Sequence, residues 1–359
     1  MNKPRILVLT AAGKTGLPIA LQLLDEGFPV TALVHREDAR SERLRSQGAQ
    51  VVVGSLTDVD DLRRAMTGAR RAYFCTPMEG AALRAAAVFA TVAAEQGLES
   101  VVVMSQWLAH PQHPSLHTRE TWLADRLFAL LPGTAVTTLN PGFFADNDLV
   151  GLPFAAQFGL LLLPYGSGRN APPSGEDLAR VAAEILARPQ GHAGQTYRPT
   201  GPALLSPQEL AEAMGRVLGR KVRYINPPTS IFSKVARGMG LSEFVIAQYG
   251  QYVRDYRRGA FEVGAPTNVV RTLTGREPES FETIARRYVT SMPEARRSLW
   301  AGLRLLVQLT GWLLRPAPRI ASHLAVDDFA DPGRVSLSAA SPDWQRSHLP
   351  TPRAVGAGD

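Results

Sequence analysis

The sequence of 359 residues is poor in cysteine and in lysine. Its single cysteine, Cys75, excludes a disulfide framework and suits a reducing compartment. Only four lysines occur, so arginine supplies most of the positive charge. Residues 1–5 lead directly into an apolar run and leave no room for a secretory signal segment. We therefore expect a cytoplasmic protein.

Two kinds of functional motif are also absent. No tyrosine is followed by a lysine four residues later, which excludes the Tyr-x-x-x-Lys pair with which short-chain reductases and epimerases transfer protons. The net charge of +7 comes from scattered arginines, and no helix-turn-helix or aromatic RNA-binding motif accompanies them. No nucleic-acid partner is therefore expected. His110, His113 and His117 lie close together, but no carboxylate or thiol completes a ligand set, so no metal site is expected.

The start of the chain carries the strongest positive signal. An apolar run at 6–9 predicts a buried strand, and helical spacing begins about ten residues later. The turn between them contains Thr10, Gly13, Lys14, Thr15 and Gly16. Such a turn lets the backbone N–H groups at a helix N-terminus face a pyrophosphate, as in a dinucleotide-binding βαβ unit. The alternative is an ordinary tight turn, because Thr10 stands where the full motif has a glycine and its Cβ crowds a phosphate.

Apolar and helical patterns alternate over the first 140 residues. Strands are expected at 5–10, 29–35, 50–53, 71–75, 100–104 and 135–139, with helices at 15–26, 38–47, 58–67, 78–96 and 118–131. This alternation predicts an α/β fold with a doubly wound parallel sheet over residues 1–150. After Pro141, loops rich in Gly and Pro alternate with helices expected at 176–188, 206–218 and 241–257. We interpret residues 151–292 as a smaller α/β region on the substrate or partner side of the sheet.

The last part of the chain differs from the rest. Residues 293–320 contain an amphipathic helix that is too short and too charged to span a bilayer. Either this helix docks on its own domain or a partner subunit, or residues 297–315 lie on a membrane surface. Residues 321–359 have few apolar side chains, so we expect a poorly ordered tail. The sequence leaves the oligomeric state open.

The expected cofactor contacts follow the ends of the predicted strands. The second strand ends in His35 and Arg36, where an NAD site would place an acidic residue for the ribose 2′-hydroxyl. These two residues and Lys14 favour a 2′-phosphate, so NADP(H) is expected in preference to NAD(H). Further cofactor contacts are expected after the third, fourth and sixth strands, at Ser55, Leu56, Thr76, Pro77, Pro141 and Phe143.

The candidate catalytic residues lie around the fifth strand. Ser105 ends that strand and has a hydroxyl for a carbonyl substrate, although it is also an ordinary residue at a strand end. His117 begins the next helix, near the expected nicotinamide. Gln106, Phe144 and Asn147 are expected to line the substrate pocket.

Taken in order, these motifs resemble the NmrA-like group of atypical short-chain dehydrogenase/reductases over roughly residues 4–290. The resembling segments are 12–16, 32–36, 140–147, 175–183, 200–211 and 218–224. The resemblance implies a Rossmann domain that binds NAD(P). Some members of the group reduce quinones or other carbonyl and conjugated compounds, whereas others lack turnover and report the NADPH/NADP ratio to a partner. Thr121 stands near a position where several members keep a lysine, and Asn140 replaces a common arginine.

The sequence therefore supports two functions. The first is an NADPH-dependent reductase of a quinone or a small carbonyl compound, for which direct hydride transfer makes few demands on protein acids. The alternative is a non-catalytic redox sensor that regulates a protein partner through its C-terminal half. The missing Tyr-x-x-x-Lys pair disfavours a third reading, a sugar-nucleotide epimerase.

Overall fold

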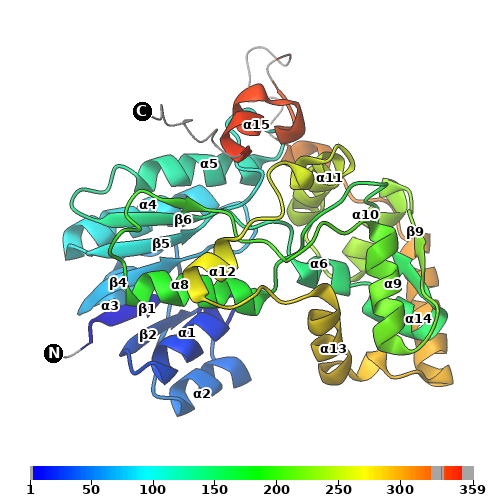
Figure 1. Ribbon diagram of the computed structural model, residues 1–359, viewed down its shortest axis with the longest axis horizontal. Coiled ribbons are helices and arrows are strands. Elements are labelled where there is room, and N and C mark those ends of the chain that lie inside the picture. The colour runs from blue at the N-terminus through cyan, green and yellow to red at the C-terminus, as the bar shows by residue number, and fades with distance from the viewer. Residues whose placement is uncertain (1–2, 325–332, 334, 350–359) are drawn as a thin grey trace, which may run out of the picture.

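The computed structural model describes residues 3–324, 333 and 335–349, and it places a large parallel sheet beside a mainly helical region (Figure 1). The seven strands of the sheet have the order β3-β2-β1-β4-β5-β6-β8. Strand order therefore reverses between β1 and β4, and ligands bind at the carboxyl ends of the strands at such a reversal. The predicted doubly wound parallel sheet is confirmed.

Strands and helices alternate through the first half, close to the predicted positions. The strands are β1 (Arg5–Val8), β2 (Val30–Val34), β3 (Gln50–Val53), β4 (Ala69–Phe74), β5 (Ser100–Met104) and β6 (Ala135–Leu139). The helices are α1 (Gly16–Asp25), α2 (Ala39–Ser46), α3 (Val59–Met66), α4 (Ala82–Gln96) and α5 (Leu116–Phe128). Side chains of Asp38, Asp58 and Ser115 accept hydrogen bonds from backbone N–H groups in the first turns of α2, α3 and α5, which fixes where these helices begin.

Both faces of the sheet are covered by helices, so successive residues of a strand enter different cores. Ile6 and Val8 pack with α1 and α8 (Gly175–Ala187) on one face. Leu7 and Leu9 pack with α3, α4 and α5 on the other. A strand that is buried on both faces consists of a continuous run of apolar residues. The apolar run at 6–9 therefore identified β1.

The second region holds its own core. It contains α6 (Ala145–Leu149), α7 (Leu152–Phe158), β7 (Leu160–Leu162), α9 (Pro207–Leu218), β9 (Arg223–Ile225), α10 (Thr229–Gly238), α11 (Glu243–Arg257), α13 (Phe281–Ser291) and α14 (Leu299–Leu314). Strands β7 and β9 pair in parallel as a separate sheet that the sequence did not predict. We expected the first region to end at residue 150. Three later elements nevertheless belong to the main sheet and its cover: α8, β8 (Thr196–Tyr197) and α12 (Val269–Thr274).

Part of the expected tail is a packed segment. Residues 335–349 include α15 (Pro342–His348), and Trp344 belongs to the core of the second region with 3% of its surface exposed. The prediction of a poorly ordered tail is wrong for these residues, because a few well-placed apolar side chains suffice to hold a short segment. Residues 325–332, 334 and 350–359 lie outside the described part of the chain.

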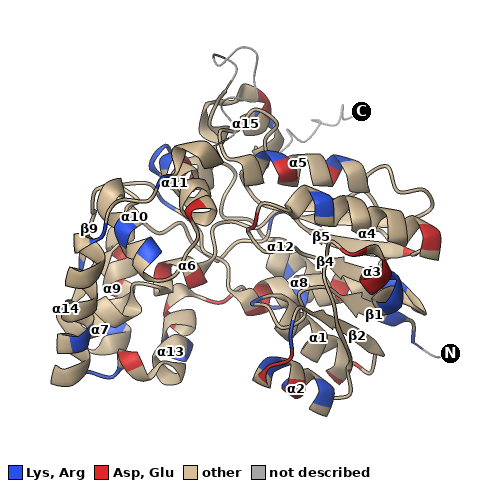
Figure 2. Cartoon of the chain, turned by 180° about the vertical axis from the view of Figure 1, so that it is seen from behind, with Lys and Arg blue, Asp and Glu red and all other residues tan. Residues whose placement is uncertain are grey.

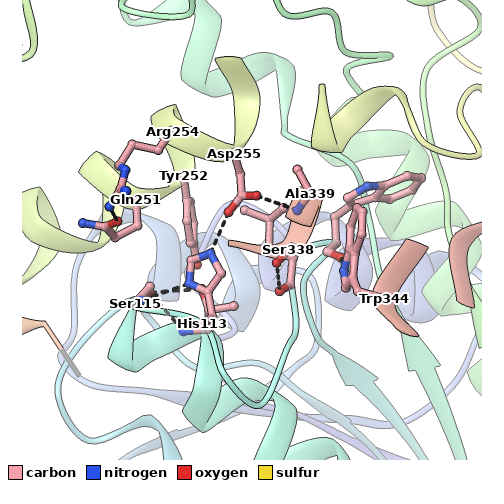
Figure 3. Close-up of polar contacts among 12 residues, drawn as sticks. His113, Ser115, Gln251, Tyr252, Arg254, Asp255, Ser338, Ala339 and Trp344 are labelled. Carbon is pink, nitrogen blue, oxygen red and sulfur yellow. Dashed lines mark hydrogen bonds and ion pairs between the residues drawn. The ribbon is translucent and has the colours of Figure 1, made fainter. Parts of the chain in front are cut away.

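A buried polar network holds this C-terminal segment (Figure 3). His113 Nδ1 accepts the Ser115 N–H at 2.9 Å, so the ring proton lies on Nε2, which donates to Asp255 Oδ2 at 2.7 Å. Asp255 Oδ1 accepts the backbone N–H of Ala339 at 2.9 Å. The Ser338 hydroxyl donates to the carbonyl of Leu108 at 2.8 Å. The C-terminal segment is therefore tied both to α11 and to the loop after β5.

Two further features concern the described residues as a set. None of their helices combines the length and the apolar character needed to cross a membrane. Among the same residues, no three His, Cys, Asp or Glu side chains gather in a way that would hold a metal ion.

Candidate cofactor and substrate site

The turn after β1 adopts a conformation that leaves little room for side chains. Thr10 has φ +46°, in the left-handed region that a β-branched residue rarely adopts. Its carbonyl accepts the Gly13 N–H at 2.7 Å. A Cβ at Gly13 would lie 2.9 Å from that carbonyl oxygen, and a Cβ at Gly16 would lie 2.3 Å from it. Both glycines are therefore required by the turn itself.

Two hydroxyl groups fix this turn to the neighbouring strand. The Thr10 hydroxyl lies 3.0 Å from the carbonyl oxygen of Cys75, at the end of β4. The Thr15 hydroxyl lies 2.8 Å from the buried Tyr73 hydroxyl. The turn thus presents the N-terminus of α1, with Lys14 beside it, at the point where strand order reverses. This is the arrangement that binds the pyrophosphate of a dinucleotide.

A cavity of about 520 Å³ begins at this turn and runs along the ends of β4, β5 and β6. Most of the residues predicted for the site line it. They are Thr10, Gly13, Lys14, Thr15, Thr76, Pro77, Ser105, Gln106, His117, Pro141, Phe143, Phe144 and Asn147. Gly16 does not line the cavity, because it packs beneath the carbonyl of Thr10.

The remaining predicted cofactor residues lie at the ends of β2 and β3, outside this cavity. His35 and Arg36 are exposed, and Arg36 has no ion-pair partner among the described residues. The adjacent Glu37 pairs instead with Arg45. The Ser55 backbone N–H donates to Asp61 Oδ2 at 2.8 Å, and the Ser55 hydroxyl lies 3.0 Å from the Thr57 hydroxyl. Because β2 neighbours β1 in the sheet and β3 lies next to β2, these side chains stand on the side of the turn toward which the adenosine half of a dinucleotide would extend.

Ser105 is paired with an acid that the sequence analysis did not single out. Its hydroxyl donates to Asp125 Oδ2 at 2.6 Å, while Asp125 Oδ1 is buried without a hydrogen-bond partner. Burial raises the pKa of the Asp125 carboxyl to about 7, against the lowering effect of the Ser105 hydrogen bond. This carboxyl therefore changes its protonation near neutral pH.

His117 faces the cavity as a neutral imidazole. Burial lowers its pKa to about 4, and its Nδ1 is buried without a hydrogen-bond partner. A polar atom in that position is normally satisfied by a ligand or by ordered water. His117 therefore offers a ligand one hydrogen-bonding group and no charge at neutral pH.

Gln106 connects the sheet to the second region. Its Nε2 donates to Thr121 Oγ1 at 2.8 Å, and its Oε1 accepts the Tyr252 hydroxyl at 2.6 Å. Asn147 Oδ1 accepts the Tyr249 hydroxyl at 3.0 Å. Burial raises the pKa of Tyr249 to about 12, and burial also raises that of Tyr252. Both phenols are therefore protonated donors at neutral pH.

Several residues of the cavity wall were missed by sequence reasoning, among them Asp125, Tyr249, Tyr252 and Phe261. Asp125 had a usable signal, because it stands eight residues after His117 and hence on the same face of the predicted helix. The two tyrosines lie on α11, three residues apart within the helix predicted at 241–257. Nothing in the local pattern indicated that α11 folds back over the ends of the strands.

A second cavity, of about 630 Å³, lies on the other side of Asp125. It is closed by the C-terminal segment, which contributes Trp344 and His348, and by the loop that carries His110. His110 Nδ1, His348 Nε2 and Asn140 Oδ1 are buried in its walls without hydrogen-bond partners. Such a lining is suited to water, which satisfies otherwise unpaired polar groups. Asp125 is the acidic residue shared by both cavities.

The comparison with known proteins agrees with this geometry. Residues 10–189 match a family described as NAD(P)H-binding. The chain is 28% identical over 295 residues to NAD(P)H azoreductase from Xenophilus azovorans, across 81% of this chain and 100% of that protein.

Two solved structures share the fold. An NADPH-dependent quinone oxidoreductase from Escherichia coli, complexed with NADPH, has a TM-score of 0.69 at 20% identity and covers 79% of this chain and 99% of its own. NmrA, a negative transcriptional regulator in complex with NADP, has a TM-score of 0.65 at 18% identity and covers 82% of this chain and 99% of its own. The resemblance to the NmrA-like group that the sequence indicated is confirmed.

Proposed function

The chain belongs to the NAD(P)H-binding family, and from that premise we propose that it is an NADPH-dependent reductase of quinones or similar unsaturated acceptors. The observation that carries the proposal is the continuity of the 520 Å³ cavity. It joins the glycine turn, to which we assign the pyrophosphate, to aromatic side chains at the other end, among them Phe143, Tyr249 and Tyr252. That combination is suited to holding a dinucleotide and a planar apolar compound in contact.

The residues present fit NADPH. The turn requires glycine at 13 and 16, and a side chain at either position would collide with the Thr10 carbonyl. Lys14 stands at the turn, and Arg36 is exposed at the end of β2 without an ion-pair partner among the described residues. An arginine with free donors binds a phosphate in a fork geometry, so we assign Arg36 to the 2′-phosphate.

The acceptor would lie between the two regions. Phe143 and Phe144 supply apolar surface, and Phe143 packs edge-on against Tyr249 with ring centroids 6.4 Å apart. At the far wall, Tyr249 and Tyr252 donate their single O–H to Asn147 Oδ1 and Gln106 Oε1, and each would turn that O–H toward a bound acceptor. His117 lines the same cavity, and its Nδ1 is buried without a hydrogen-bond partner. These groups would orient a carbonyl oxygen or an azo nitrogen, the group that the azoreductase relative is named for.

Reduction of such an acceptor needs one hydride and one proton. Bound NADPH supplies the hydride when the site is loaded. We assign the proton to the Ser105 hydroxyl, which would donate to the acceptor atom that gains negative charge. Protonated Asp125 would restore that hydroxyl proton across their 2.6 Å contact, and water in the second cavity would then reprotonate Asp125. This pathway would replace the missing Tyr-x-x-x-Lys pair.

The first experiment measures binding and turnover with the same protein. The full chain is titrated with NADPH and with NADH by nicotinamide fluorescence, and a quinone and an azo dye are then added. We expect NADPH to bind at least tenfold more tightly than NADH, and each acceptor to oxidise it. The variant Arg36→Ala should lose about tenfold in NADPH affinity with little change for NADH, whereas the nearby exposed Arg43→Ala should change neither.

The outcomes separate the two candidate functions. Absence of NADPH binding would overturn the proposal. Tight NADPH binding without oxidation by any acceptor would favour the alternative, a redox sensor that regulates a protein partner. That alternative is supported by the absence of the Tyr-x-x-x-Lys pair and by the shared fold of NmrA, a transcriptional regulator.

A further inference from the structure

Helix α14 is attached to the second region through one of its faces. Trp312 packs against α10, where a Cβ on Gly238 would come within 2.1 Å of its ring. Lys234 on α10 donates to the carbonyl of Leu313 at 2.9 Å. At the other end, Gln157 on α7 accepts the Ser298 N–H at 3.1 Å. Both ends of α14 are therefore fixed, and the orientation of its opposite face is defined.

That opposite face is apolar and exposed. Fourteen large hydrophobic side chains are exposed among the described residues, and six of them lie on α14: Leu299, Trp300, Leu303, Leu306, Val307 and Leu314. Leu299 is 93% exposed and Trp300 78%. A helix that is apolar on both sides normally has both sides covered. The exposed side of α14 is thus a surface that lacks its covering in the isolated chain.

Positive charge predominates around this face, with Glu243 and Glu294 at its margins. Residues 295–324 contain five arginines and no aspartate or glutamate. Arg296 and Arg297 precede the helix, Arg304 lies on it, and Arg315 and Arg319 follow it. On the neighbouring α10, Lys234 binds the carbonyl of Leu313 and Arg237 pairs with Glu243 at 3.7 Å, so the excess positive charge comes from the five arginines of 295–324. Figure 2 shows α14 at the edge of the molecule.

We propose that this face binds an anionic lipid surface, with α14 lying in the plane of the interface. Exposed leucines and Trp300 would enter the apolar boundary, while arginines at both ends of the helix would reach the lipid phosphates. The helix of 16 residues is about 24 Å long, which is too short to span a bilayer. A second copy is a poorer occupant, because a symmetric contact would bring two sets of arginines together with no acidic residue from 295–324 between them.

Vesicle co-sedimentation tests the proposal with the full chain and without NADPH. We expect binding to vesicles of phosphatidylcholine with phosphatidylglycerol to exceed binding to pure phosphatidylcholine by at least tenfold, and to weaken as salt is raised. The double variant Arg297→Gln/Arg304→Gln should lower the partition coefficient by about tenfold or more. Leu299→Glu should do the same without changing the NADPH affinity.

A matched control tests whether replacing any exposed leucine with glutamate lowers vesicle binding. Leu130 is 78% exposed but lies just after α5, far from α14 in the sequence, and Leu130→Glu should leave vesicle binding unchanged. The proposal is overturned if the wild type binds neither vesicle, or if Leu130→Glu lowers binding as much as Leu299→Glu. It is also overturned if light scattering shows a dimer that Leu299→Glu dissociates, because a second copy then covers the face.

Discussion

Asp125 is the residue whose environment departs furthest from what its position in the sequence suggests. It is a charged residue on a helix otherwise expected to cover the sheet, yet its carboxyl reaches between two cavities. Ser105 approaches it from β5, and His110, Arg198, Asp343 and His348 line the cavity behind it. Arg126 follows it on α5. Among these groups, burial is the dominant influence on its pKa.

The raised pKa of Asp125 makes stability depend on pH. Its pKa rises from 3.8 to about 7 on folding, so the folded chain keeps a proton that the unfolded chain releases between these values. The free energy of unfolding should therefore fall as pH rises from 4 to 7, by at most about 1.4 kcal/mol per pH unit from this group. Asp125→Asn should remove that slope in urea denaturation measured across the range. Parallel pH dependences of the two proteins would contradict the assignment.

Whether a candidate site residue could be predicted from the sequence depends on how far along the chain its contacts lie. Thr10, Gly13 and Lys14 were identified because the glycine spacing of a phosphate turn is local. Ser105 was identified from its place at a strand end, and Asn147 from the segment 140–147 that follows the sixth predicted strand. Tyr249 and Tyr252 were not identified, because Tyr252 meets Gln106 across 146 residues and Tyr249 meets Asn147 across 102. No local pattern specifies a contact between residues so far apart.

Among the elements, long periodic segments were predicted well and short ones were not. The amphipathic helix expected within 293–320 is α14, and the alternation before residue 140 predicted every strand of the sheet up to β6. Strand β7 has only three residues, Leu160–Leu162, and such a run fits a strand or a helix equally well. The tail was misjudged because its few buried apolar side chains, Leu337 and Trp344 among them, form no periodic pattern.

The contact between α10 and α14 depends on one glycine. Gly238→Ala would place a Cβ where Trp312 now packs, so α14 should shift or separate from α10. We expect a loss of about 1–3 kcal/mol in unfolding free energy and faster amide exchange in α14. Gly311→Ala is the matched control: nothing lies within 4 Å of its new Cβ, and it should stabilise α14 by up to about 1 kcal/mol. Equal effects of the two substitutions would show that Gly238 matters only through helix propensity.

At the scale of the whole molecule, the C-terminal segment joins the sheet to the second region. The Trp344 indole N–H donates to the carbonyl of Trp107 at 3.0 Å, and the Trp107 indole donates to the carbonyl of Ala260 at 2.9 Å. Trp107 follows Ser105 and Gln106 on the same loop and lines the 520 Å³ cavity. The position of the candidate catalytic residues is therefore coupled to a segment more than 200 residues later in the chain.

This coupling predicts two separable losses in Trp344→Ala. Truncating a buried tryptophan should lower the unfolding free energy by about 3–5 kcal/mol, because it removes core packing and enlarges the second cavity. At temperatures where the variant is still folded, acceptor reduction should fall severalfold, because the loop carrying Ser105 loses a support. NADPH affinity should change little, since the phosphate turn lies at β1, outside this network. Trp300→Ala, an exposed site, should change stability by no more than about 0.5 kcal/mol. If Trp344→Ala weakens NADPH binding as much as turnover, the C-terminal segment supports the whole fold and has no specific effect on the reacting end of the cavity.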